Sequence, residues 1–193
     1  MALILASSSP LRRAMLDSAG VAHGAIAPDV DEDAVKAGGA SPAAMAEQLA
    51  VAKAVSVSAR HPEDWVIGSD SMVSVGERRF DKPRDRADAA DHLRFFSGKA
   101  MVLTSAVALA RDGAADWSHV GQAQLHVREL SEAFIEAYLD AEWPDVAYCV
   151  GVFRLEGRGV TLFDRIDGDH FTILGMPLLP LLGALRDRGV LQR

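Results

Sequence analysis

The chain has 193 residues, of which 49% are hydrophobic and 24% charged, which is typical of one globular domain or one domain divided into two lobes. A formal net charge of −7 argues against binding along a nucleic-acid backbone, but a few basic side chains in one place can still hold a phosphate ligand. The single cysteine, Cys149, excludes an internal disulfide and fits a reducing compartment, and no apolar run reaches the roughly 18 residues that cross a bilayer. We therefore expect a cytoplasmic protein with no nucleic-acid or membrane partner.

Signals for strands and helices alternate along the first part of the chain. Residues 3–7 form a short apolar run without a basic flank, which indicates a buried first strand rather than a signal peptide. Ser9–Pro10 is typical of a helix start and predicts a helix over residues 11–19. Ser41–Pro42 begins a second helix in the same way, as far as about residue 60.

Later segments favour local pairing of strands. The remaining predicted elements are, in chain order, a strand at 65–68 ending near Asp70, a hairpin turn at 76–77 leading to 79–80, a helix at 87–96, antiparallel strands at 101–110 and 123–127, a helix capped by Ser131 and reaching about 141, strands at 151–155 and 160–166, and a helix at 178–188. This order predicts an α/β fold with a mixed sheet. We expect a single domain over residues 1–193, with a break between two lobes near 97–100, although no linker-like stretch marks it.

Basic and hydroxyl side chains occur at three points that suit a phosphate ligand. The loop after the first strand contains Ser7, and the helix that follows carries Arg12 and Arg13. Free N–H groups at a helix start, with hydroxyls and guanidinium groups, form a natural phosphate site, whereas the alternative is an ordinary capped helix with solvent-facing arginines. Lys53 interrupts an alanine- and valine-rich helix, and Lys82 is held extended by the proline after it. Each lysine can neutralise phosphate charge or lie on the surface without a role.

Acidic side chains supply the other half of the chemistry. Asp70 follows an apolar strand, where a carboxylate acts as a general base or metal ligand, or simply caps a turn. The acidic run at 29–33 suits a divalent cation that bridges phosphate oxygens, but such a run is also common in solvated loops. No Walker-type P-loop, dinucleotide-binding glycine motif or H-E-x-x-H zinc motif is present.

Taken in order, these features resemble the Maf family of nucleotide pyrophosphatases over nearly the whole chain. The similar segments read LILASSSPLRR, APDVDE, LAVAKA, VIGSDSMV, DKP, LRFFSGKAMVLTSAVAL and LEGRGVTLFDRIDGDHFTILGMP. The resemblance implies a Maf/ITPase-like fold, in which a central mixed twisted sheet is flanked by helices and two lobes surround a nucleotide cleft. It also implies a house-cleaning hydrolase that uses a divalent cation, Mg or Mn, to convert a nucleoside triphosphate to a monophosphate and pyrophosphate. A homodimer is suggested on the same ground.

The resemblance assigns roles by position. Asp70 is the expected catalytic carboxylate. The expected phosphate-binding residues are Ser7, Arg12, Arg13, Lys53 and Lys82, and the expected metal ligands are Asp31, Glu32 and Asp70, with Asp167 and Asp169 as weaker candidates.

Departures from the commonest family pattern bear on the choice of base. Four features are similar to the branch that acts on 7-methyl-GTP: Leu11 before the two arginines, the G-S-D of residues 68–70, Cys149 in place of a lysine and Glu156 in place of a glutamine. The match is incomplete because position 71 is a serine, Ser71. A carboxylate can accept hydrogen bonds from guanine and favours a positively charged methylated purine, whereas a neutral amide suits a pyrimidine. The alternatives are a dTTP/UTP pyrophosphatase, or a nucleotide-binding regulator of cell division and septum formation without turnover. The last alternative is kept open by Cys149 and by Asp81, which places an acid beside Lys82.

Overall fold

The computed structural model describes residues 1–192, which divide into two compact units. The first unit comprises Met1–Ser71, Thr104–Gly121 and the segment from Asp169 onward, and the second comprises Met72–Leu103 and Gln122–Gly168. The chain passes from one unit to the other after Ser71, Leu103, Gly121 and Gly168. None of the helices described is long and apolar enough to span a membrane.

The first unit is built on parallel strands joined by helices. Its elements are β1 (Leu3–Ala6), α1 (Pro10–Ser18), β2 (Gly24–Ile26), α2 (Glu32–Lys36), α3 (Pro42–Ser58), the start of β3 (Trp65–Val75), the end of β5 (Ala100–Arg111), the start of β6 (Ala114–Val127), α6 (His170–Ile173) and α7 (Leu178–Asp187). Serine hydroxyls cap α1 and α3 as predicted, since Ser9 and Ser41 each accept a backbone N–H of the first turn and a proline follows each cap.

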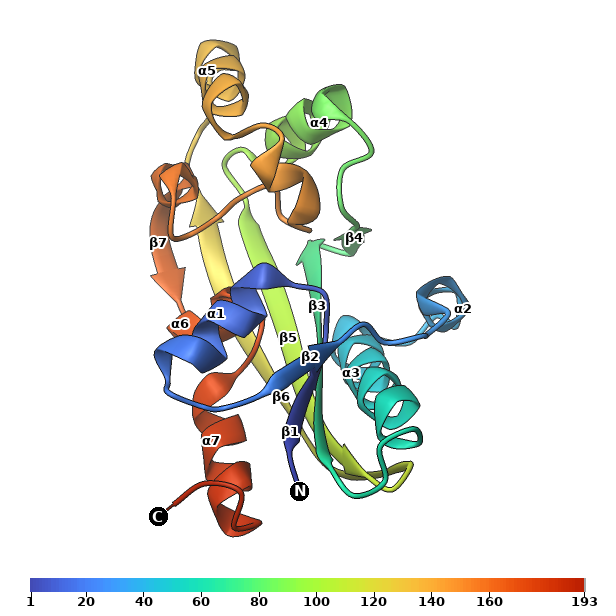
Figure 1. Cartoon of the computed structure of the whole chain (residues 1–193). Helices are drawn as coiled ribbons and strands as arrows, with labels where there is room; N and C mark the ends of the chain where they lie inside the picture. The colour runs from blue at the N-terminus through green and yellow to red at the C-terminus, as the bar shows by residue number, and fades with distance from the viewer. Residues whose placement is uncertain (193) are drawn as a thin grey trace. The chain divides into compact units, whose positions relative to one another are not determined.

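The strand order in the first unit is β2-β1-β3-β5-β6. Strand β1 is parallel to both neighbours, and Leu5 lies opposite Ala25 on β2 and Ile67 on β3. Helices α1 and α7 cover one face of these strands and α3 covers the other (Figure 1). One hydrophobic core cluster lies on the α1 and α7 side, where Leu5 and Ile67 are fully buried. Side chains alternate between the two faces of a strand, so the residue after Ile67 faces α3.

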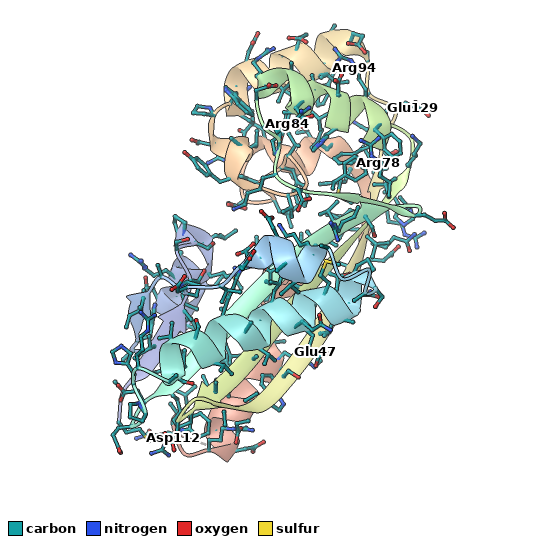
Figure 2. The ribbon with its side chains drawn as sticks, turned by 90° about the vertical axis from the view of Figure 1, so that its right-hand side faces the viewer. Glu47, Arg78, Arg84, Arg94, Asp112 and Glu129 are labelled. Atoms are coloured by element: carbon teal, nitrogen blue, oxygen red, sulfur yellow. The ribbon has the colours of Figure 1, made fainter. Side chains whose placement is uncertain are left out.

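The second unit contains the other ends of the shared strands and the remaining helices. Its elements are the end of β3, β4 (Arg78–Phe80), α4 (Arg86–Phe96), the start of β5, the end of β6, α5 (Glu132–Glu142), the short 3-10 helices η1 (Asp145–Tyr148) and η2 (Arg158–Leu162), and β7 (Phe163–Asp167). Strands β4 and β7 pair antiparallel with β3 and β6, which makes the sheet mixed, as predicted. Exposed ion pairs join α4 to α5, among them Arg94 with Glu132 at 2.8 Å (Figure 2).

Several predicted elements were wrong in place or kind. The strand predicted at 151–155 is a series of turns in which Val152 has a positive φ of 55°, because these apolar residues are buried without being extended. The strand predicted from 160 begins only at Phe163, after a 3-10 helix. Strand β3 does not end near Asp70 but continues to Val75, and β6 starts at Ala114. The short elements β2, α2 and α6 were not predicted.

Candidate active site

Asp70 lies within β3, just beyond the point where the neighbouring strand stops. The register of β1 with β3 ends at Ala6 opposite Gly68, so β3 has no β1 partner at Asp70. Asp70 is only 7% exposed, and its Oδ1 accepts a hydrogen bond from Lys53 Nζ at 2.6 Å. The turn-capping alternative for Asp70 is therefore wrong, because the residue is part of a strand and its carboxylate is bound to a lysine.

Lys53 links two carboxylates. Its ammonium lies 2.6 Å from Asp70 Oδ1 and 2.6 Å from Glu32 Oε1, and the lysine is 7% exposed. A lysine this buried needs charged partners, because burying an unpaired ammonium is costly. The close packing of α3 on β3 at Gly68 brings Lys53 to Asp70, since a Cβ at Gly68 would lie 2.0 Å from the carbonyl oxygen of Ala50. The surface alternative for Lys53 is wrong.

Arg12 reaches the same region from α1. Its Nε donates to Gly175 O at 2.9 Å, one terminal nitrogen to Ser69 O at 2.9 Å and the other to Ser71 Oγ at 3.1 Å. Burial lowers the pKa of Arg12, and the negative charges of Asp70 and Glu32 oppose that shift. A guanidinium stays protonated under these conditions, so Arg12 is a half-buried cation held by protein groups rather than a solvent-facing arginine.

The other predicted residues of the first half of the chain differ in their surroundings. Ser7 is 6% exposed, and its hydroxyl oxygen accepts the backbone N–H of Ser9 at 3.1 Å, which places it at the start of α1. Leu11 is half-buried on α1, whereas Arg13 is exposed. Nothing in the described contacts draws Arg13 to Asp70, and its role stays a prediction.

The acidic residues proposed as metal ligands divide in the same way. Asp31 is exposed and caps α2 by accepting Ala34 N at 3.1 Å. Asp167 is paired with Arg165 and His126, and Asp169 caps α6 by accepting Thr172 N. No group of three or more histidine, cysteine or acidic side chains suited to a metal occurs within residues 1–192.

The donor set of Glu32 and Asp70 nevertheless suits one kind of metal ion. Magnesium commonly takes one or two protein carboxylates and completes its shell with water and substrate phosphates. Glu32 and Asp70 are held by one ammonium, which brings two carboxylates together. The residues therefore fit a magnesium-like ion that arrives with a phosphate ligand, and they do not form a complete metal cage by themselves.

Lys82, Cys149 and Glu156 belong to the second unit. Burial raises the pKa of Cys149 to about 11, the negative charge of Glu156 adds to this shift, and Arg154 and Lys82 oppose it. These charges act on one another within that unit. The thiol is neutral at neutral pH, which agrees with the interpretation of Cys149 as a structural residue and not a nucleophile.

Sequence reasoning missed two sets of residues. In the second unit, Glu142 is 5% exposed and accepts two hydrogen bonds from Arg154, whose remaining terminal nitrogen lies 2.9 Å from Asp145. In the first unit, Ser105 and Gly175 contact Ser71. Ser105 and Gly175 lie within segments that carry the family resemblance, whereas Glu142 and Asp145 lie outside them and have no such signal.

The fold and these contacts define an α/β protein with a buried centre of paired acidic and basic side chains, a type of site suited to phosphate chemistry. The family model described as Maf-like protein matches residues 2–188, and the chain belongs to this family.

Relatives and one solved structure agree with this assignment. A protein named 7-methyl-GTP pyrophosphatase from Rhizobium etli is 52% identical, with 98% of this chain and 97% of the relative covered. A protein named nucleoside triphosphate pyrophosphatase from Nitrobacter hamburgensis is 48% identical, with 98% and 95% covered. The structure of the Staphylococcus aureus Ham1 protein aligns with a TM-score of 0.51 and 13% identity over 97% of this chain and 98% of that one, which supports the fold alone. The predicted family and fold class are confirmed.

Proposed function

We propose that this chain is a nucleoside triphosphate pyrophosphatase, which hydrolyses its substrate to a nucleoside monophosphate and pyrophosphate. The observation that carries the proposal is the buried pair of Asp70 and Lys53, with Glu32 on the same ammonium and Arg12 nearby. Relatives with this activity in their names align over 98% of the chain. We further propose that the enzyme works in the cytoplasm and removes a modified nucleotide as a house-cleaning step.

In this proposal Asp70 takes the proton of the attacking water. Lys53 holds Oδ1 of Asp70 at 2.6 Å and so fixes the carboxylate in one orientation. As the water oxygen bonds to phosphorus, the bond to the bridging oxygen breaks and pyrophosphate leaves with the electron pair. Lys53 and Arg12 take up part of the developing negative charge, and the Ser7 hydroxyl can donate to a phosphate oxygen. The family motif also makes Lys82 a predicted phosphate-binding residue.

We also propose that the enzyme uses a divalent metal ion, Mg or Mn. Glu32 and Asp70 would hold the ion together with the substrate phosphates. The ion would withdraw charge from the phosphate oxygens and so make phosphorus more open to attack.

For the substrate we favour 7-methyl-GTP, and the charge of the second unit supports this choice. The guanidinium of Arg154 donates to Glu142 and lies against Asp145, so two carboxylates already balance its charge. Exposed Glu156 lies two residues further on. A carboxylate there suits a base that carries a positive charge, as 7-methylguanine does.

The test is a panel of 7-methyl-GTP, GTP, dTTP and UTP with magnesium or manganese, in which released pyrophosphate and the nucleotide product are measured. Asp70→Asn should lower turnover by about 10²–10⁴-fold, because the proton acceptor is lost. Asp112→Asn, at an exposed acid in the turn between β5 and β6 of the same unit, is the matched control and should keep full activity. Full activity in the Asp70 variant would remove that residue from the mechanism.

The same panel tests the choice of substrate. Glu156→Gln should lower the preference for 7-methyl-GTP over GTP and leave hydrolysis itself in place. An unchanged preference would contradict the role of Glu156, and a wild-type preference for dTTP or UTP would favour the pyrimidine alternative. Saturable nucleotide binding without turnover by the wild-type protein would favour a regulatory role instead.

A further inference from the structure

The hydroxyl of Ser71 is engaged within the first unit. Ser71 Oγ lies 2.9 Å from Ser105 Oγ, 3.1 Å from a terminal nitrogen of Arg12 and 3.2 Å from Gly175 O. Arg12 can only donate, so Ser71 accepts that hydrogen bond. Either of the two other neighbours can receive the single hydroxyl proton of Ser71.

The neighbours show where that proton goes. Ser105 Oγ lies 2.8 Å from Thr172 O, a carbonyl that can only accept, so the Ser105 proton is used there. The contact between Ser71 and Ser105 therefore needs the proton of Ser71. If the Ser71 hydroxyl donated to Gly175 O instead, its acceptor would still be a protein group. In both cases the Ser71 hydroxyl donates to a protein group and accepts from Arg12.

Arg12 is oriented by the residues on either side of Asp70. One terminal nitrogen donates to the carbonyl of Ser69 and the other to the hydroxyl of Ser71. The Ser69 carbonyl lies past the last β1 partner of β3, so Arg12 supplies a donor there in place of a neighbouring strand. Its Nε donates to Gly175 O, where φ is +101°, a conformation that favours glycine. The guanidinium uses three of its five N–H donors in this way, and its plane is fixed.

We infer that Ser71 is a positioning residue that holds Arg12 beside Asp70, and that it does not contact the base. Ser105 supports it by receiving its proton. The inference rests on the proposed function, and it reassigns a residue that the family resemblance links to base choice. The other residues linked to base choice, Leu11 and Glu156, keep that role.

The two roles of Ser71 predict different kinetics. A hydroxyl that contacts the base affects the nucleotides unequally, so its loss changes the ratio of their kcat/KM values. A hydroxyl that orients Arg12 affects the phosphate centre, which every nucleotide shares, so its loss lowers all kcat/KM values by one factor. Loss of a hydrogen bond to a charged group corresponds to about 10-fold or more.

The experiment compares Ser71→Ala, Ser71→Thr and Ser105→Ala with the wild-type enzyme on 7-methyl-GTP, GTP and dTTP. Ser71→Ala should lower kcat/KM about 10-fold on all three, with their ratios unchanged within about 2-fold. Ser71→Thr keeps the hydroxyl and should retain most of the activity, and Ser105→Ala should show a smaller loss of the same uniform kind. Ser118→Ala removes a half-buried hydroxyl that bonds Glu47 in the same unit, and this control should match the wild type.

Binding of inorganic pyrophosphate, measured by calorimetry, gives a readout that does not need turnover. Ser71→Ala should weaken this binding, and Ser118→Ala should leave it unchanged. A change of about 10-fold or more in the ratio between two nucleotides, or wild-type values throughout for Ser71→Ala, would overturn the inference. If the wild-type protein hydrolyses none of the nucleotides but Ser71→Ala still weakens pyrophosphate binding, the proposed function fails and the positioning role stands.

Discussion

Gly68→Ala should separate the two residues on which the proposed chemistry depends. A Cβ at this position would lie 2.0 Å from Ala50 O and 2.6 Å from Ala54 N, both backbone atoms of α3. Ordinary contact begins near 3.4 Å, so the helix must move away by roughly 1.4 Å. Lys53 lies on this stretch of α3, and its 2.6 Å hydrogen bond to Asp70 would be lost or lengthened.

The expected cost has two parts. Overpacking of this kind destabilises a domain by about 1–3 kcal/mol, which for a chain of this length corresponds to roughly 2–4 °C of melting temperature per kcal/mol. Misplacement of a positioning group by about 1 Å lowers turnover by about 10²-fold. Activity should therefore fall much further than the folded fraction at the assay temperature.

Thermal melting and steady-state pyrophosphate release measure the two parts separately. Gly24→Ala is the matched control, because a Cβ added at this exposed position on β2 would meet nothing within 4 Å. This variant should melt and react like the wild type. Wild-type melting and activity in Gly68→Ala would refute the packing argument and the link from helix position to chemistry.

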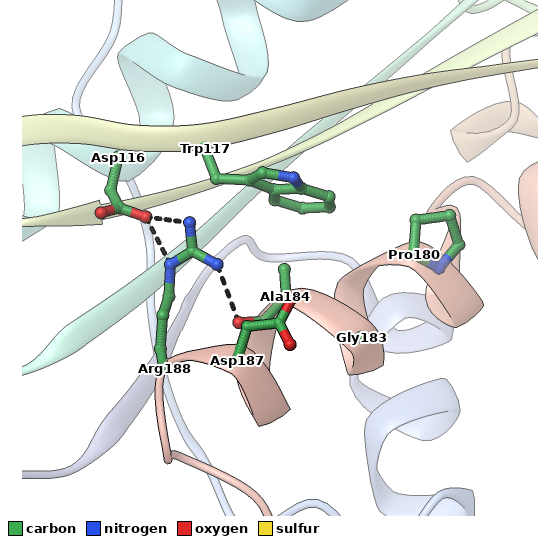
Figure 3. A pocket seen from close by; sticks show the side chains of 7 residues that line it. All are labelled: Asp116, Trp117, Pro180, Gly183, Ala184, Asp187 and Arg188. Carbon is green, nitrogen blue, oxygen red and sulfur yellow. Dashed lines mark hydrogen bonds and ion pairs between the residues drawn. The ribbon is translucent and has the colours of Figure 1, made fainter.

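Two further predictions concern stability. Gly183 lies within α7 at the edge of a groove beside Trp117, and nothing lies within 4 Å of its Cβ position (Figure 3), so Gly183→Ala should stabilise the protein by about 0.5–1 kcal/mol in thermal or urea unfolding. Burial lowers the pKa of His92 below 6.5, and the negative charge of Asp88 opposes this shift. Folding therefore favours the neutral ring. The contribution of His92 to the free energy of unfolding is present above pH 6.5 and is lost as the pH falls below that value. Urea unfolding from about pH 7 to about pH 5 should show a shallower loss of stability in His92→Leu than in the wild type, and parallel curves would contradict the prediction.

Local chemistry made most helices predictable from the sequence. Ser9, Ser41 and Ser131 cap their helices as expected, because capping depends on residues within one turn. At Asp112–Gly113, between β5 and β6, both residues adopt the positive φ of a two-residue hairpin turn, for which an Asp-Gly pair is a local signal. The continuation of β3 past Asp70 depends instead on pairing with β4 and β5, which no local signal reports.

The candidate site was predictable in its residues but not in its connections. Arg12, Glu32, Lys53 and Asp70 follow one another along the chain as in the family pattern, and this order predicted that they form one acidic and basic centre. The bond from Arg12 to Gly175 joins residues 163 positions apart, and nothing near Arg12 in the sequence identifies that acceptor. Long-range partners of this kind decide whether an arginine faces solvent or is held by protein groups.

Asp81 and Cys149 are two departures from the commonest family pattern. Both lie in the second unit, whereas Asp70, Lys53, Glu32 and Arg12 all lie in the first and keep their mutual contacts there. With its pKa raised to about 11, Cys149 is a neutral thiol where the family commonly has a lysine, so the surroundings of Glu156 have one positive charge fewer. If Glu156 contacts the base as proposed, that loss makes its carboxylate more attractive to a cationic base. On the proposed function, the departure at Cys149 therefore bears on the choice of base.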